Sequence, residues 1–91
     1  MLHAETKLIT MTEQDITEGA QGDPESCPVA RAISRETGCE SVFVDNAIWV
    51  NGQYAFGGDG AHGALDWAVR FDQKGAAMKP LQPFDLTYWV K

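Results

Sequence analysis

One stretch of the sequence combines a turn, a helix start and a thiol: Gly22-Asp23-Pro24-Glu25-Ser26-Cys27-Pro28-Val29-Ala30-Arg31-Ala32-Ile33. Cys27 falls at the N-terminal end of the helix that this pattern predicts, where backbone N–H groups and the helix dipole favour a thiolate. A cysteine nucleophile also needs a base, and His3 and His62 are the two histidines of the chain. A cysteine followed by Pro28 and Val29 is more often a small buried hydrophobic residue. We therefore predict no catalytic residue.

Other candidate sites in the sequence fail on spacing. Cys27 and Cys39 bracket the predicted helix, which separates them by roughly 16 Å against the roughly 4.4 to 6.8 Å that a disulfide allows. Two unpaired cysteines and two distant histidines do not make a tetrahedral zinc set. The glycine-rich stretch 57–63 lacks the lysine and the hydroxyl residue of a P-loop. We expect it to be a flexible entry to a helix, with Asp59 as the cap, and we predict no metal and no cofactor.

Charge is the clearest compositional signal. The chain of 91 residues carries a net charge of −6, and before Cys27 its carboxylates face a single basic residue, Lys7. Such a field repels nucleic acid and attracts basic protein surfaces, so we expect a basic protein partner and no direct contact with nucleic acid. The alternative is that the carboxylates only keep a small protein soluble. The candidate binding residues in this acidic segment are Glu13, Asp15, Glu18, Asp23 and Glu25.

The first half of the chain predicts one strand and two helices. Residues 7–11 form a short strand, and Thr12 with Asp15 forms a capping box that opens a short helix. A second helix runs from Ser26 or Cys27 to residue 37, and Gly38 ends it.

The second half predicts three further strands around the hairpin, a third helix and a last strand. The strands lie at 41–45, at 47–49 and after the turn at Asn51-Gly52, the helix at about 61–73 and the last strand at 84–90. We therefore predict a single α+β domain over residues 1–91, in the order β-α-α-β-β-β-α-β. Its antiparallel sheet is covered mainly on one face by helices.

The loop length at Asn51-Gly52 decides which aromatic side chains face outward. A two-residue loop leaves both faces of the hairpin apolar, with Trp49 beside Tyr54. A three-residue loop instead pairs Ile48 with Tyr54 and leaves one core face, so we favour that register. Trp49 then points outward, and alternation in the last strand predicts the same for Trp89. The two indoles are further candidate partner-binding residues.

Two groups of motifs resemble a family of small uncharacterised proteins of bacteriophages, prophages and bacteria. The opening is similar in Ile9-Thr10-Met11-Thr12-Glu13-Gln14-Asp15-Ile16 with Gly19, then in Gly22-Asp23 and Cys27-Pro28-Val29-Ala30-Arg31-Ala32-Ile33. The ending is similar in Val69-Arg70-Phe71-Asp72 with Gly75, then in Pro83-Phe84-Asp85-Leu86. The chain departs from the family pattern at 57–63, where a more compact helix start is expected. The resemblance spans most of the chain and transfers no catalytic residue.

This resemblance implies a biological context. A small acidic phage-type protein is often an accessory factor that binds and disables a host complex, and anti-CRISPR proteins are one such class. We therefore predict an interaction protein that inhibits a host defence or nucleic-acid-processing complex by occupying a basic surface on a protein or ribonucleoprotein. Two alternatives stay open, namely an enzyme or redox module built on Cys27 and a structural module with a homo-oligomeric interface, for example a homodimer, through the face of Trp49 and Trp89.

The sequence also bears on location. No apolar run approaches the roughly 20 residues of a membrane span. The first residues have neither the basic start nor the apolar segment of a signal peptide. We therefore expect no membrane contact and a cytoplasmic protein, in the host cytoplasm if a phage encodes it.

Overall fold

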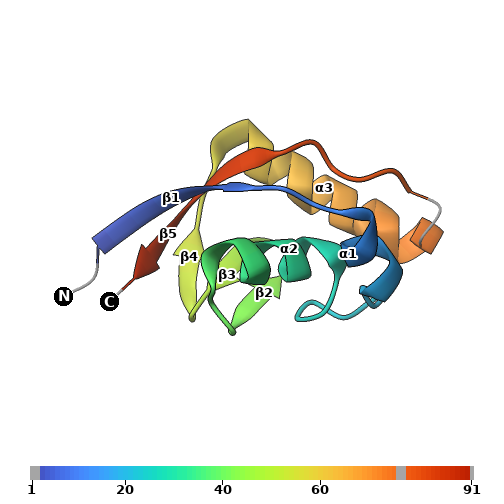
Figure 1. Cartoon of the computed structure of the whole chain (residues 1–91), viewed down its shortest axis with the longest axis horizontal. Coiled ribbons are helices and arrows are strands. Elements are labelled where there is room, and N and C mark those ends of the chain that lie inside the picture. The colour runs from blue at the N-terminus through green and yellow to red at the C-terminus, as the bar shows by residue number, and fades with distance from the viewer. Residues whose placement is uncertain (1–2, 76–77, 91) are drawn as a thin grey trace.

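The computed structural model describes residues 3–75 and 78–90, and its elements follow the predicted order (Figure 1). They are β1 (His3–Ile9), α1 (Glu13–Glu18), α2 (Pro28–Thr37), β2 (Val42–Val44), β3 (Ile48–Val50), β4 (Gln53–Ala55), α3 (Gly58–Lys74) and β5 (Phe84–Val90). The predicted α+β class is confirmed. The first strand begins earlier than predicted because β1 pairs with β5 over its whole length.

The strands form two small antiparallel sheets, β1–β5 and β2–β3–β4. A single bridge joins them: Phe56 N–H donates to Thr87 O at 2.9 Å, and Thr87 N–H donates to Phe56 O at 2.7 Å. The chain turns into α3 directly after Phe56, so the two sheets meet at this one residue pair. Through it the strands follow the order β2-β3-β4-β5-β1, in which the first and the last strand lie side by side (Figure 1).

The β3–β4 hairpin has a two-residue turn, so the predicted three-residue loop is wrong. The register pairs Ile48 with Ala55, Trp49 with Tyr54, and Val50 with Gln53. Asn51 and Gly52 have φ angles of 54° and 77°. This left-handed pair is what a type I′ turn requires, and its twist matches that of the flanking strands. The preference for one apolar face misled the prediction because both faces of this hairpin carry apolar side chains.

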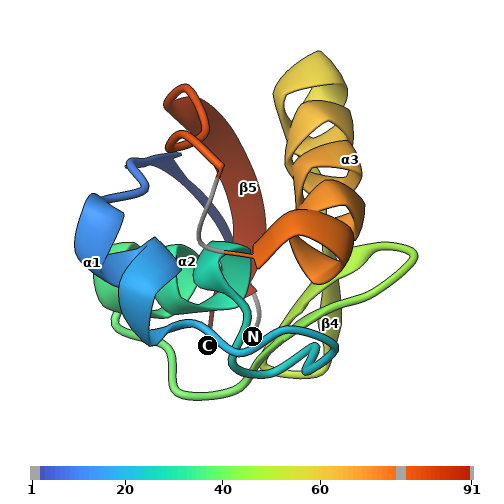
Figure 2. The same ribbon diagram turned by 90° about the vertical axis from the view of Figure 1, so that its right-hand side faces the viewer.

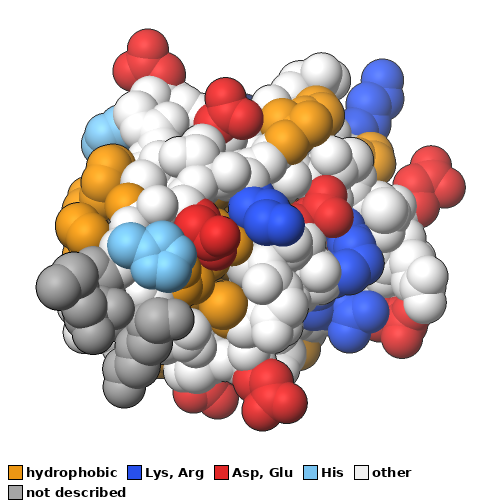
Figure 3. All heavy atoms as spheres, turned by 60° about the vertical axis from the view of Figure 1, so that its left-hand side comes forward, with side chains coloured by type: hydrophobic (Ala, Val, Ile, Leu, Met, Phe, Trp, Pro, Cys, Tyr) orange, Lys and Arg blue, Asp and Glu red, His pale blue; other side chains and the backbone are white. Residues whose placement is uncertain are grey.

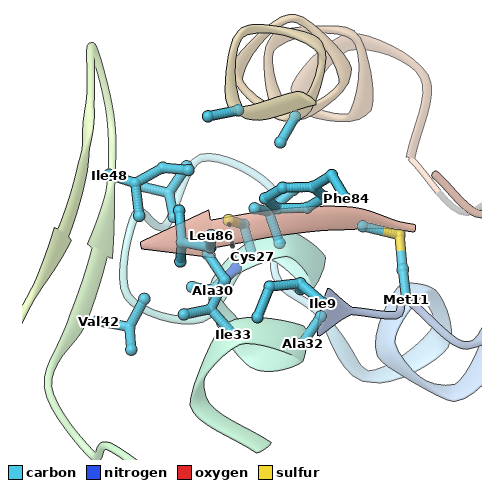
Figure 4. Close-up of a cluster of buried hydrophobic side chains, with 14 of the residues drawn as sticks. Ile9, Met11, Cys27, Ala30, Ala32, Ile33, Val42, Ile48, Phe84 and Leu86 are labelled. Carbon is cyan, nitrogen blue, oxygen red and sulfur yellow. Dashed lines mark hydrogen bonds between the residues drawn. The ribbon is translucent and has the colours of Figure 1, made fainter. Parts of the chain in front are cut away.

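The core lies between the inner face of the strands and the two longer helices. Figure 2 shows α2 and α3 flanking β5. Val42 and Ile48 of the three-stranded sheet point toward Phe84 and Leu86 of β5 and toward Ile33 of α2 (Figure 4). All five side chains are at most 7% exposed. Their burial supplies the main hydrophobic stabilisation of the fold.

The second helix begins and ends as predicted. Cys27 is its N-cap, with Sγ accepting a hydrogen bond from Ala30 N–H at 3.5 Å, and Pro28 occupies the first turn. Gly38 ends the helix in the left-handed conformation. The first helix likewise has the predicted capping box of Thr12 and Asp15.

The glycine-rich stretch belongs to α3, so the prediction of a flexible entry is wrong. The helix begins at Gly58, and Asp59 lies in its first turn without capping it. A Cβ at Gly57 would overlap the carbonyl oxygen of Asp85, and one at Gly60 would lie 2.7 Å from Phe84 Cβ. Gly57 and Gly60 are therefore required because the N-terminal end of α3 rests directly on β5.

Candidate functional site

Four exposed aromatic side chains lie on the face of the β2–β3–β4 sheet that points away from the core. Phe43 is 38% exposed, Trp49 40%, Tyr54 52% and Phe56 43%. Phe43 lies opposite Trp49 across β2 and β3, and Trp49 lies opposite Tyr54 across β3 and β4. The rings of Trp49 and Tyr54 meet edge to face at 5.8 Å, and Tyr54 stacks on Phe56 at 6.4 Å. We call these four residues the aromatic strip.

The bridge continues this outer face onto β5. Thr87 lies opposite Phe56, and Trp89, two residues further along β5, points to the same side as Thr87. Trp89 is 36% exposed. Trp49 and Trp89 thus both point away from the core, as predicted, and their role in binding stays a prediction.

The strip itself was missed in the sequence. Its members Phe43, Tyr54 and Phe56 were not candidates, because the favoured hairpin register turned Tyr54 and Phe56 toward the core. The signal was present in Asn51-Gly52, the residue pair that type I′ hairpin turns prefer. Contiguous exposed apolar side chains of this kind mark interaction sites.

The acidic segment is not one exposed surface. Asp15 is only 2% exposed. Its carboxylate accepts a hydrogen bond from Thr12 N–H at 3.0 Å, and Arg35 Nη1 lies 2.5 and 2.7 Å from its two oxygens. Arg35 also donates to Thr10 O. Asp15 therefore links α1, α2 and the chain before α1, and it is too buried to contact a partner directly.

Helix α2 also brings a second arginine to this segment. Arg31 Nη2 lies 3.7 Å from Glu18 Oε1, and Arg31 Nε lies 3.9 Å from Asp15 Oδ1. Both arginines line a hollow of about 400 Å³ together with Glu25. The segment is thus partly neutralised by side chains that are distant in sequence. Figure 3 shows a face where basic and acidic side chains are intermixed and where hydrophobic side chains gather toward one edge.

The remaining residues of the segment are exposed. Glu13, Asp23 and Glu25 lie on α1 and the turn before α2, and Asp23 Oδ1 accepts a hydrogen bond from Glu25 N–H at 3.0 Å. Asp23 also lines a hollow of about 140 Å³ with Asp45 and Asp72, and no lysine or arginine is among its lining residues. The negative field at this end of the molecule therefore combines residues from three parts of the chain.

Cys27 also lines that hollow and is 4% exposed. Burial raises the pKa of the Cys27 thiol. The hydrogen bonds from Ala30 and Val29 N–H oppose this rise, and the charges of Asp72 and Asp23 add to it. The thiol is thus protonated near neutral pH and serves as a helix cap. His62 lines a different hollow, between the β3–β4 hairpin and the start of α3.

Residues 3–75 and 78–90 contain both cysteines, and both are free thiols. No group of three or more His, Cys, Asp or Glu side chains in these ranges could hold a metal ion. Within the same ranges, no helix has the length and apolar character needed to cross a membrane.

Comparison with known proteins gives no family. No protein-family model, curated protein or solved structure matches the chain.

Proposed function

We propose that this protein is a small phage-type interaction protein that inhibits a host defence or nucleic-acid-processing complex, in the manner of an anti-CRISPR protein, by binding a basic protein surface. The observation that carries the proposal is the aromatic strip. Its four side chains are each 38 to 52% exposed. Tyr54 is in ring contact with Trp49 and Phe56, and the strand register places Phe43 opposite Trp49. A preformed aromatic surface of this kind loses little side-chain entropy when it binds a partner.

The charge of the outer face favours a basic partner. The strand positions that point outward are Ala4, Thr6, Leu8, Phe43, Trp49, Tyr54, Phe56, Asp85, Thr87 and Trp89. Asp85 is the charged residue in this set, and the set contains no lysine or arginine. Exposed indole and phenol rings attract arginine and lysine side chains through cation–π contacts. Aromatic rings with a carboxylate beside them therefore suit a basic protein surface.

The exposed carboxylates of the acidic segment act at longer range in this proposal. With a net charge of −6, the molecule attracts a basic partner before contact, and charges at the rim change mainly the association rate. Glu13, Asp23 and Glu25 supply this field. Glu18 and Asp15 contribute less because Arg31 and Arg35 partly neutralise them.

The test is inhibition of a host complex in cells. Plasmid interference is measured in bacteria with an active CRISPR system that express the wild type or Trp49→Ser/Tyr54→Ser. Loss of inhibition in the double variant, with unchanged circular dichroism, supports the proposal. Val69→Ser is the matched control, since Val69 is an exposed apolar residue at 55% on α3.

A second arm tests the charge. Glu13→Lys/Glu25→Lys should slow association with the purified complex and flatten its salt dependence, whereas Asp59→Lys/Asp66→Lys on α3 changes net charge equally and should have a smaller effect. The proposal would be contradicted if cells that express the wild-type protein showed unimpaired plasmid interference in each host defence system tried. Inhibition that survives both the aromatic and the charge substitutions would contradict it too.

A further inference from the structure

Strand β1 is an edge strand whose second side is open. β5 pairs with β1 from the His3–Val90 pair to the Ile9–Phe84 pair. Residues 3–8 of β1 are all exposed. Among the described residues, β1 makes no backbone hydrogen bond other than those to β5. Such an edge is a template for pairing with another strand.

The bridge between the two sheets fixes which backbone groups face this open edge. Both backbone groups of Thr87 are used by Phe56, because Thr87 N–H donates to Phe56 O and Thr87 O accepts from Phe56 N–H. The two backbone groups of a residue in an antiparallel strand point to the same side, so Thr87 has none left for Thr6, which lies opposite it. Thr6 therefore forms a non-hydrogen-bonded pair with Thr87, in which side chains are close, and their Oγ atoms are 2.9 Å apart. The N–H and C=O of Thr6 point to the open edge, as do those of Ala4 and Leu8.

We propose that a second copy of this chain occupies this edge, with β1 paired against β1 in an antiparallel register centred on Thr6. Thr6 then exchanges both backbone hydrogen bonds with Thr6 of the second copy. Ala4 and Leu8 exchange theirs reciprocally, so every outward-facing backbone group from residue 4 to residue 8 is paired. The two outer faces lie on the same side of one continuous sheet. This dimer goes beyond the proposed inhibitory function, and it uses the open backbone edge of β1 and not the aromatic strip.

The side chains of β1 are self-complementary in this register, which is why the occupant is a second copy. Glu5 lies opposite Lys7 of the other chain, and symmetry repeats the contact. These two positions form non-hydrogen-bonded pairs, in which facing side chains are closest. Leu8, which is 57% exposed, lies opposite Ala4. An unrelated strand would have no reason to match a charge pattern that is symmetric about Thr6.

The test is a charge exchange read out by sedimentation over a concentration series. Glu5→Lys and Lys7→Glu should each raise the dimer dissociation constant by about tenfold or more, because both symmetric ion pairs become repulsive. The double variant Glu5→Lys/Lys7→Glu restores the opposite charges and should restore the dimer. An equimolar mixture of the two single variants should form a heterodimer, detected by native mass spectrometry after isotope labelling of one of them.

Control variants separate this register from a general effect of net charge. Glu40→Lys changes the net charge as Glu5→Lys does but lies between α2 and β2, so it should leave the dissociation constant within about twofold of the wild type. Thr6→Pro removes a backbone donor that β5 does not use and should abolish the dimer while the monomer stays folded. A wild type that stays monomeric at millimolar concentration would overturn the inference. A dimer that is lost in the charge-exchanged double variant, or that is unaffected by all the β1 substitutions, would overturn it equally.

Discussion

Arg35 of α2 holds Asp15 of α1 through one nitrogen that lies 2.5 and 2.7 Å from the two carboxylate oxygens. Asp15 at the same time closes the capping box with Thr12. The same pairing raises the pKa of Arg35 above its already high ordinary value, first through the hydrogen bond to Asp15. A residue selected from the sequence as part of a binding surface thus has a structural role at the junction of two helices.

Replacement of Asp15 should destabilise the fold. Asp15→Ala removes a helix cap and leaves Arg35 without its buried counter-charge, so we expect a loss of about 2 to 3 kcal/mol in the free energy of unfolding. Urea unfolding followed by circular dichroism measures this loss. The control is Glu13→Ala on the exposed side of the same helix, which should cost under about 0.5 kcal/mol. Equal effects of the two substitutions would show that the Asp15–Arg35 contact does not stabilise the fold.

Two glycines of α3 should respond to alanine in opposite directions. Gly60→Ala places a methyl group 2.7 Å from Phe84 Cβ. That atom cannot move without shifting the Phe84 side chain or β5, so we expect a destabilisation of about 1 to 3 kcal/mol. Gly63→Ala has nothing within 4 Å of the new methyl group and should stabilise the helix by about 0.5 to 1 kcal/mol. Thermal unfolding of both variants provides the measurement, and a stabilising Gly60→Ala would mean that α3 does not rest on β5 here.

The hairpin turn provides a test of the register. Gly52→Ala introduces a Cβ at φ 77° and should cost about 1 kcal/mol or more, because L-residues avoid this conformation. Asn51→Gly should be close to neutral, because glycine also adopts the left-handed conformation. Chemical denaturation compares the two variants. If Gly52→Ala were harmless, the two-residue turn and the outward position of Tyr54 would both be in doubt.

The buried thiol predicts a specific loss of stability at alkaline pH. The unfolded chain releases the Cys27 proton near its ordinary pKa of 9.0, whereas the folded chain holds it to higher pH. This contribution to stability is therefore complete below the ordinary pKa and is lost as pH rises toward the folded pKa. Cys27→Ser keeps a helix cap without this titration and should lose less stability over the same range.

Tyr88 provides the background for that comparison. Burial raises the pKa of Tyr88 above 10.0, and the charges of Glu5 and Cys39 add to the rise. The effect of Tyr88 ionisation on stability at alkaline pH is the same in the wild type and in Cys27→Ser. It therefore cancels when the stabilities of the two proteins are subtracted. Identical pH profiles of the wild type and Cys27→Ser would mean that the Cys27 thiol is not shielded by the fold.

Local signals in the sequence predicted the elements, and long-range contacts determined the site. The caps of α1 and α2 depend on residues within a few positions of one another, so Thr12 and Gly38 could be assigned from sequence alone, and Cys27 could be placed at the start of α2. The neutralisation of Asp15 depends on Arg35, which is distant in sequence and reaches Asp15 only once α1 packs on α2. The contact of Gly60 with Phe84 joins two distant segments in the same way. The aromatic strip could have been predicted from a local signal, the turn residues Asn51-Gly52. That signal was outweighed by the assumption that only one face of the hairpin is apolar.

The pairing of β1 with β5 has a consequence for the order in which the protein forms. Among the described elements, β1 is synthesised first and its partner strand β5 is synthesised last. Until residues 84–90 leave the ribosome, β1 has neither its neighbour nor the inner side chains of β5 against which the core packs. Contacts that close so long a loop form slowly. The nascent chain therefore carries β1 as an unpaired strand until β5 has been synthesised, and an unpaired strand is prone to aggregate during that interval.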